Sequence, residues 1–137
     1  MVEDVSFKDF EILSRTIFGE AVGEPWRGRV GVAHVILNRW KSKKWFSAPT
    51  IAEVCLKKFQ FSCWNEGDPA HARMISAGGI ALATSMSAAM AALTGEEKDP
   101  TKGATHYYAD YIPSPKWAEG KTPSVKIGRH LFFTNVD

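Results

Sequence analysis

The 137-residue chain has little of several features that define broad protein classes. Its two cysteines, Cys55 and Cys63, cannot build a disulfide framework, and their spacing does not match a common zinc-binding motif. We therefore expect buried free thiols, with a single bridge as the alternative. The net charge is only +2, and the one small basic cluster (Arg39, Lys41, Lys43 and Lys44) is too small to predict a nucleic-acid-binding surface.

Long apolar runs rich in Leu or Ile are also absent. The N-terminus, MVEDVSFKDF, contains acidic residues and no apolar core, so we expect no secretory signal. The uncharged run from Met74 to Gly95 consists mostly of Ala, Ser, Gly, Thr and Met, which favours a buried helix over a transmembrane helix. Because the chain has no internal repeats and no linker, we expect one domain over residues 1–137.

The first helix is predicted by its start signal and its apolar spacing. Ser6 and Asp9 resemble a capping box. Apolar residues then recur at spacings of three and four, at Phe10, Leu13 and Ile17. The same face continues to Glu20, and Gly23 and Pro25 end the helix. Glu20 therefore falls at a helix C-terminus, where the helix dipole disfavours a negative charge.

A second helix is expected from Pro25, with Glu24 as a weak cap and an almost wholly apolar stretch over residues 30–37. His34 and Asn38 form its polar stripe, and they either bond inside the core or face a cleft. Ser47, Pro49 and Thr50 open a short third helix toward Cys55.

Residues from Pro69 to about Leu93 predict a long helix with a kink or break at Gly78 and Gly79. Its apolar stripe is Ile75, Leu82, Met86 and Leu93. KFQFSCW (58–64) indicates a strand or extended loop, with Phe59, Phe61 and Cys63 on one side and Gln60, Ser62 and Trp64 on the other. ATHYYA (104–109) and VKIGRHLFF (125–133) are expected to pair. The fold class is α+β, mainly helical, with a small antiparallel sheet.

Glu20 and Glu24 are the candidate catalytic residues. A carboxyl group in apolar surroundings holds its proton to a higher pH than an exposed one, which makes it usable as an acid near neutral pH. Paired carboxylates suit glycoside cleavage, because one protonates the leaving oxygen while the other stabilises or attacks the sugar. Capping of the second helix is the alternative role for Glu24.

Metal chemistry is not expected, although the chain has four histidines (His34, His71, His106 and His130). The sequence contains no H-E-x-x-H motif, and no two histidines have ligand spacing on one helix. We expect no metal and no cofactor.

Four ordered motifs resemble one family. SRTIFGEAVGEPWRGRVGVAHVILNR resembles the opening signature of the SleB-type cell wall hydrolases, the spore-cortex-lytic family that also occurs in phages. KFQFSCW is similar to its Gln-Phe-Ser segment, DPTKGATHYY to its Asp-Pro-Thr-x-Gly-Ala turn, and KIGRHLFF to its Ile-Gly-x-His-x-Phe ending. Together these motifs extend over nearly the whole chain.

The resemblance implies a lysozyme-like fold and cleavage of the β-1,4 bond between N-acetylmuramic acid and N-acetylglucosamine in peptidoglycan. The essential acid of the family corresponds to Glu20, and Glu24 corresponds to a recurrent glutamate that orients rather than donates. A substrate groove is expected to use Gln60, Ser62 and His130 with Tyr107 or Tyr108, since adjacent strand residues point to opposite faces. His130 as a purely structural histidine is the alternative.

Several functional alternatives stay open at this point. We expect lytic transglycosylase chemistry, with lysozyme-type hydrolysis assisted by Glu24 or Asp68 as the nearer alternative. A zinc-dependent amidase and a non-catalytic wall-binding module are the other two classes. Without an export signal, the expected role is that of a monomeric, phage endolysin-like enzyme that is made in the cytoplasm, does not insert stably into membranes and acts on the cell wall. A chromosomal or prophage-derived copy is an equally compatible origin.

Overall fold

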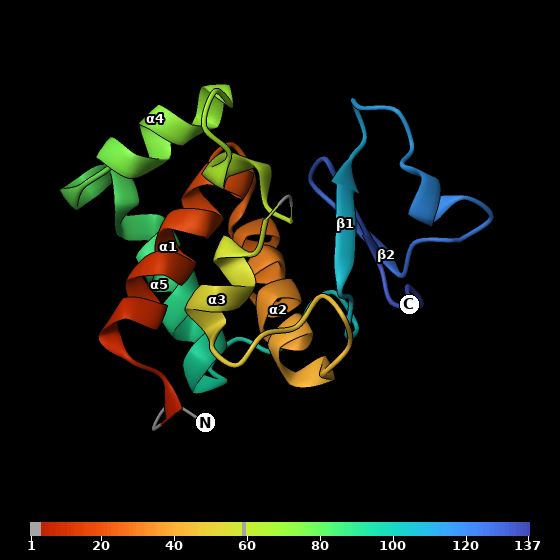
Figure 1. The fold of residues 1–137 in the computed structure, drawn as a ribbon, viewed down its shortest axis with the longest axis horizontal. Coiled ribbons are helices and arrows are strands. Elements are labelled where there is room, and N and C mark those ends of the chain that lie inside the picture. The colour runs from red at the N-terminus through yellow and green to blue at the C-terminus, as the bar shows by residue number, and fades with distance from the viewer. Residues whose placement is uncertain (1–3, 59) are drawn as a thin grey trace.

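The structure is a computed structural model that describes residues 4–58 and 60–137. Helices form one side of the molecule, and a three-stranded sheet forms the other (Figure 1). The elements are α1 (Phe7–Ala21), α2 (Trp26–Ser42), α3 (Ile51–Leu56), the 3₁₀ helix η2 (Ser62–Trp64), α4 (Pro69–Ser76), α5 (Gly79–Thr94), β1 (His106–Ala109), the 3₁₀ helix η3 (Lys116–Ala118), β2 (Val125–Ile127) and β3 (His130–Phe133).

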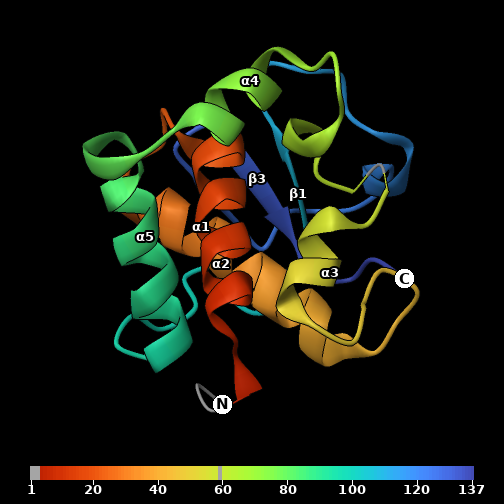
Figure 2. The same ribbon diagram turned by 60° about the vertical axis from the view of Figure 1, so that its left-hand side comes forward.

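Helix α1 is central to the helical part and contacts all four other α-helices. Figure 2 shows it running between α5 and α3 with α4 above. The predicted capping box is confirmed: Ser6 Oγ accepts from the Asp9 N–H and Asp9 Oδ2 accepts from the Ser6 N–H, both at 3.0 Å. Leu13 and Ile17 are fully buried. The same helical face therefore brings Glu20, in the last turn, to the boundary between helices and sheet.

The start of α2 corrects one prediction. The helix begins at Trp26, Pro25 occupies the N-cap position, and no side chain caps it. Glu24 is therefore not a cap. Its carboxylate turns instead toward the β2–β3 turn, where Oε1 accepts from the backbone N–H of Arg129 at 2.9 Å. The apolar stretch over residues 30–37 is buried as predicted, apart from its polar position His34.

The polar stripe of α2 anchors the loop that follows α5. His34 Nε2 lies 2.8 Å from the carbonyl oxygen of Glu97. Asn38 Nδ2 donates to Asp99 Oδ2 and to the carbonyl oxygen of Ala104, both at 2.9 Å. Of the two predicted alternatives, these side chains take the internal structural one.

The break predicted at Gly78 and Gly79 is confirmed, since α4 and α5 are bent by 94° relative to each other. The predicted stripe is right only in part: Leu82 and Leu93 are buried, but Ile75 is 51% exposed and Met86 is 37% exposed. The bend turns α4 out of line with the buried face of α5, so the stripe does not continue to Ile75. Met86 lies within α5, and its exposure has no such explanation. In the described residues no single helix is long and apolar enough to cross a membrane, and α4 and α5 meet that length and composition only when taken together.

The described residues of the segment KFQFSCW do not form a strand. Local hydrogen bonds over three residues, such as Trp64 N to the carbonyl of Phe61 at 3.1 Å, fold it into a turn and η2. The predicted alternation survives as a burial pattern, with Phe61 and Cys63 buried and Ser62 exposed; Phe59 lies outside the described residues. Cys63 and the other cysteine are both free and buried, so the alternative of a bridge is wrong.

The predicted pairing of the two C-terminal segments is confirmed. The sheet is antiparallel in the order β1-β3-β2, with Tyr107 opposite Phe132 and Ile127 opposite His130. The segment VKIGRHLFF forms two strands rather than one, because Gly128 takes a positive φ of 57° in the turn between them. This turn points toward Glu24.

Candidate active site

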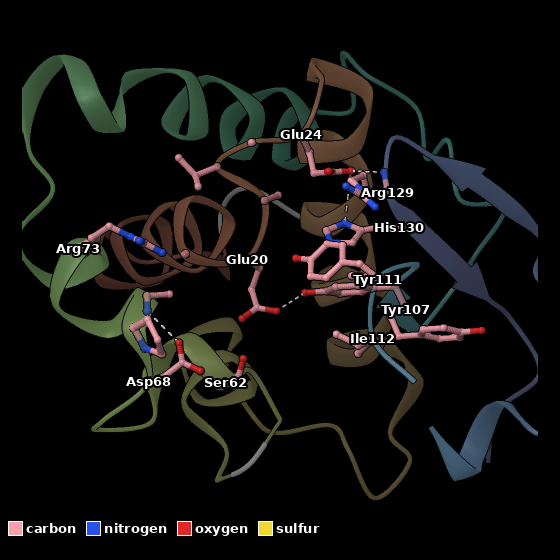
Figure 3. A pocket seen from close by; sticks show the side chains of 18 residues that line it. Glu20, Glu24, Ser62, Asp68, Arg73, Tyr107, Tyr111, Ile112, Arg129 and His130 are labelled. Atoms are coloured by element: carbon pink, nitrogen blue, oxygen red, sulfur yellow. Dashed lines mark hydrogen bonds and ion pairs between the residues drawn. The ribbon is translucent and has the colours of Figure 1, made fainter. Parts of the chain in front are cut away.

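A cleft of about 700 Å³ lies between the helices and the sheet (Figure 3). The end of α1, η2 and the start of α4 line one wall, and β1 with the β2–β3 turn lines the other. Six of the seven residues predicted from the sequence line it: Glu20, Glu24, Ser62, Tyr107, Tyr108 and His130. Gln60 is not among the lining residues.

Glu20 is held from both walls of the cleft. Its Oε1 accepts from the hydroxyl group of Tyr107 at 2.6 Å, and its Oε2 accepts from the backbone N–H of Cys63 at 3.2 Å. Close packing makes the second contact possible: a Cβ atom at position 19 would lie 2.6 Å from the Cβ of Cys63, so only glycine lets η2 approach α1. The half-buried carboxyl group is therefore fixed in orientation while it lines the open cleft.

The structure distinguishes between the two tyrosines that the sequence left open. Tyr107 faces Glu20, and its ring packs against His130 at a centroid distance of 4.8 Å. Burial, and secondarily the charge of Glu20, raise the pKa of Tyr107 well above its usual value, so its hydroxyl group stays a donor. Tyr108 also lines the cleft, but its ring stacks on Phe133 at 5.6 Å.

His130 lies behind Tyr107 and next to Glu24. Its Nδ1 is 3.8 Å from Glu24 Oε1 and has no hydrogen-bond partner among the described residues. Burial lowers the pKa of His130, while Glu24 and Glu20 oppose this shift. A side chain at Gly128 would collide with Glu24 Oε1, so the carboxylate is enclosed between the turn and His130. The backbone N–H of Arg129 and the neighbouring His130 therefore fix the position of the Glu24 carboxylate.

Three further charged side chains line the cleft. Asp68, which the sequence suggested only as an alternative, caps α4 by accepting from the N–H of Ala70 at 2.9 Å. Arg73 extends from α4 into the cleft (Figure 3). Arg129 pairs with Asp110 at 2.9 Å. Nothing in the sequence pattern singles out Arg73 or Arg129, because neither falls within a spacing that predicts a site.

Gln60 does not reach the surface of the cleft and contacts Arg39 instead. Its Oε1 accepts from Nη1 of Arg39 at 3.0 Å. The structure thus brings Gln60 to a buried cation of α2 instead of to the cleft surface. No group of three or more His, Cys, Asp or Glu side chains in the described part of the chain is arranged to hold a metal ion.

Comparison with known proteins gives a consistent set of relatives. The family model for cell wall hydrolases matches residues 23–133, a range that begins three residues after Glu20. The spore cortex-lytic enzyme of Halalkalibacterium halodurans is 29% identical over 130 residues, covering 93% of this chain and 35% of that protein. The corresponding enzyme of Bacillus cereus is 30% identical, covering 93% of this chain and 44% of that protein. The chain thus spans less than half the length of these curated relatives.

Two solved structures have the same architecture. The catalytic domain of the Bacillus cereus SleB protein superposes with a TM-score of 0.76 at 29% identity, covering 93% of this chain and 91% of that one. The catalytic domain of the germination-specific lytic transglycosylase SleB from Bacillus anthracis gives a TM-score of 0.75 at 29% identity, covering 93% and 94%. The lysozyme-like fold is therefore confirmed, and the chain belongs to the cell wall hydrolase family.

Proposed function

We propose that the protein cleaves the β-1,4 bond between N-acetylmuramic acid and N-acetylglucosamine in bacterial peptidoglycan, as a lytic transglycosylase that leaves 1,6-anhydro ends. One observation carries this proposal: Glu20 is held by donors from both walls of an open cleft. The other two carboxylates that line the cleft secure the backbone, Glu24 at the β2–β3 turn and Asp68 at the start of α4. Glu20 is the one of the three that donors from both walls hold in place, and a single positioned carboxyl group suits a mechanism in which the same residue is acid and then base.

The reaction proceeds in two steps. Glu20 first donates its proton to the glycosidic oxygen as the bond from the muramic C1 to that oxygen breaks, leaving an oxocarbenium-like centre. The Glu20 carboxylate then takes the proton of the muramic C6 hydroxyl group, and the oxygen of that hydroxyl group forms the new bond to C1. No water is consumed and Glu20 returns to its starting state. Tyr107 and the Cys63 N–H keep the carboxyl group aligned through both steps.

The remaining predicted site residues support this chemistry. Ser62 and His130 line opposite walls, where hydroxyl and imidazole groups can bond to sugar substituents. Tyr108 also lines the cleft and adds an aromatic side chain to it. We propose that Glu24 acts through His130 and the turn and does not donate the proton.

The relatives support peptidoglycan as the substrate class. The curated relatives are named spore cortex-lytic enzymes, and one of the solved structures is described as a lytic transglycosylase. We propose bacterial peptidoglycan as the partner of this chain and the cell wall as its place of action, with the protein acting as a monomer. The phage endolysin-like role stays a prediction.

Mass spectrometry of digested sacculi tests the reaction type. The proposal expects 1,6-anhydro-muramic ends, full activity in the presence of a chelator, and no new free amino groups on L-alanine. Reducing ends would favour lysozyme-type hydrolysis, for which Asp68 and Glu24 supply carboxylates in the same cleft. Free L-alanine amino groups with chelator sensitivity would instead identify an amidase.

Glu20→Gln tests the assignment of the acid. The variant keeps an oxygen that can accept from Tyr107 or Cys63 but cannot deliver a proton, so the rate should fall by several orders of magnitude while the fold stays intact. Thermal unfolding and circular dichroism provide the control for folding. Activity close to that of the wild type would remove Glu20 from the site.

A further inference from the structure

Arg39 is a buried cation with an unusual set of partners. The sequence places it in a small basic cluster, yet its side chain is only 5% exposed. Its Nε donates to the carbonyl oxygen of Thr105 at 2.6 Å, and its Nη1 donates to Oε1 of Gln60 at 3.0 Å. The guanidinium carbon lies 4.9 Å from the ring centroid of Phe61 and 5.6 Å from that of Phe46. All these partners are neutral, although a buried charge is costly unless an opposite charge lies nearby.

The two hydrogen bonds of Arg39 reach the two segments that hold Glu20. Gln60 precedes η2, whose Cys63 N–H donates to Glu20. Thr105 directly precedes β1, whose Tyr107 hydroxyl donates to Glu20. One side chain from α2 therefore ties together both walls of the cleft behind the catalytic carboxyl group.

The titratable groups around Arg39 point to Glu20 as its counter-charge. Burial lowers the pKa of Arg39, while Tyr107, Glu20 and Cys55 oppose this shift. Burial raises the pKa of Cys55 to about 12 and that of Tyr107 well above its usual value, so both stay neutral near neutral pH. Burial and the charge of Arg39 lower the pKa of His106 to about 4, so it too is neutral there. Glu20 is the only carboxyl group in this set.

We propose that Arg39 is a positioning residue for catalysis: it fixes η2 and β1 around Glu20 and supplies the buried positive charge that stabilises the Glu20 carboxylate after proton transfer. This inference rests on the proposed function, because it concerns the residue that stabilises the carboxylate form of the proposed acid, Glu20. Arg39 does not line the cleft, so it acts through Glu20 and does not touch substrate.

The pH dependence of activity separates this role from a merely structural one. Initial rates of sacculus turbidity loss are measured over a wide pH range for wild type, Arg39→Gln, Arg39→Lys and Gln60→Ala. Arg39→Gln keeps an amide donor and removes the charge, so the basic limb of the profile should move to higher pH. Arg39→Lys and Gln60→Ala keep the charge and alter only the hydrogen bonds, so their rates can fall but their limbs should stay in place.

Either of two results would overturn the proposal: an unmoved limb in Arg39→Gln, or an equal displacement in Gln60→Ala. If Arg39→Gln does not fold, Arg39→Lys decides, because a displaced limb in a variant that keeps the charge contradicts an electrostatic role. A wild-type protein without activity at any pH would count against the proposed function. In that case, measurements of thermal stability test the pairing of Arg39 with Glu20.

A double-mutant cycle supplies that independent readout. Melting temperatures are compared for Arg39→Gln, Glu20→Gln and the double variant at neutral pH. If the two charges stabilise each other, the loss in the double variant is smaller than the sum of the single losses, and the difference shrinks in acid. Additive losses at neutral pH would contradict the pairing of Arg39 with Glu20 whether or not the protein has activity.

Discussion

The hydrogen bond from Tyr107 to Glu20 allows a prediction with a worked magnitude. Tyr107→Phe removes one oxygen atom and leaves the ring packed against His130 and Phe132, at centroid distances of 4.8 and 5.7 Å. The bond strengthens as Glu20 becomes a carboxylate during proton donation, because a hydroxyl group donates more strongly to a charged acceptor. A bond to a charged group contributes about 2 kcal/mol. We therefore expect kcat/KM to fall about thirtyfold, mainly through kcat, since the bond acts in the transition state.

The assay for this prediction is the release of soluble fragments from purified sacculi, with rates compared at equal concentrations of folded protein. Because the aromatic packing is kept, the melting temperature should change by only about 3 °C, the shift that corresponds to about 1 kcal/mol in a domain of this size. Tyr108→Phe is the matched comparison, since its ring stacks on Phe133 away from the acid, and its loss should be much smaller. Wild-type kcat/KM in Tyr107→Phe, or equal losses in both variants, would refute the reasoning.

Three further predictions concern packing, charge and acid stability. Gly19→Ala should lower stability by about 1–3 kcal/mol and reduce activity, because its Cβ would lie 2.6 Å from the Cβ of Cys63. Gly23→Ala is the control in thermal unfolding, because a Cβ at that position meets nothing within 4 Å. Equal losses in the two variants would contradict the packing argument. Burial lowers the pKa of His106 to about 4 in the folded state, so the unfolded state binds the proton first as the pH falls. The free energy of unfolding should therefore decrease between a pH of about 6.5 and about 4, by at most about 3 kcal/mol. Urea unfolding of wild type and His106→Phe checks this, and an unchanged acid dependence in the variant would exclude His106 as the cause. Glu24→Gln keeps an oxygen for the β2–β3 turn, so its rate should fall at least tenfold less than that of Glu20→Gln in the same sacculus assay; equal losses would give Glu24 a direct part in the chemistry.

The sequence predicts most of the helical part because its signals are local. The capping residues Ser6 and Asp9 and the apolar spacing that leads to Glu20 lie within one helix, so the position of the acid follows from short-range rules. The break at Gly78 and Gly79 is predicted in the same way. Its angle is not, and the exposure of Ile75 depends on that angle.

The parts of the site that the sequence does not predict depend on contacts between distant segments. The segment around Gln60 alternates like a strand, but its described residues form local turns and η2 instead. Gln60 then bonds to Arg39 instead of lining the cleft. Arg39 itself looks like a surface residue in a basic cluster, and only the folded chain places it between two aromatic rings. The choice between Tyr107 and Tyr108 likewise depends on which face of the strand meets α1.

The two walls of the cleft come from segments that are far apart in the chain, which affects when the cleft can form. Tyr107 and Glu20 are 87 residues apart in the chain, and the N–H that holds Glu24 comes from Arg129, 105 residues later. Contacts of such long range form late in folding, because the intervening loop must be closed first. During synthesis, the helices can pack while strands β2 and β3 are still inside the ribosome. A nascent chain therefore has Glu20 in place but no complete cleft, and the proposed activity should begin only after β3 emerges and pairs with β1.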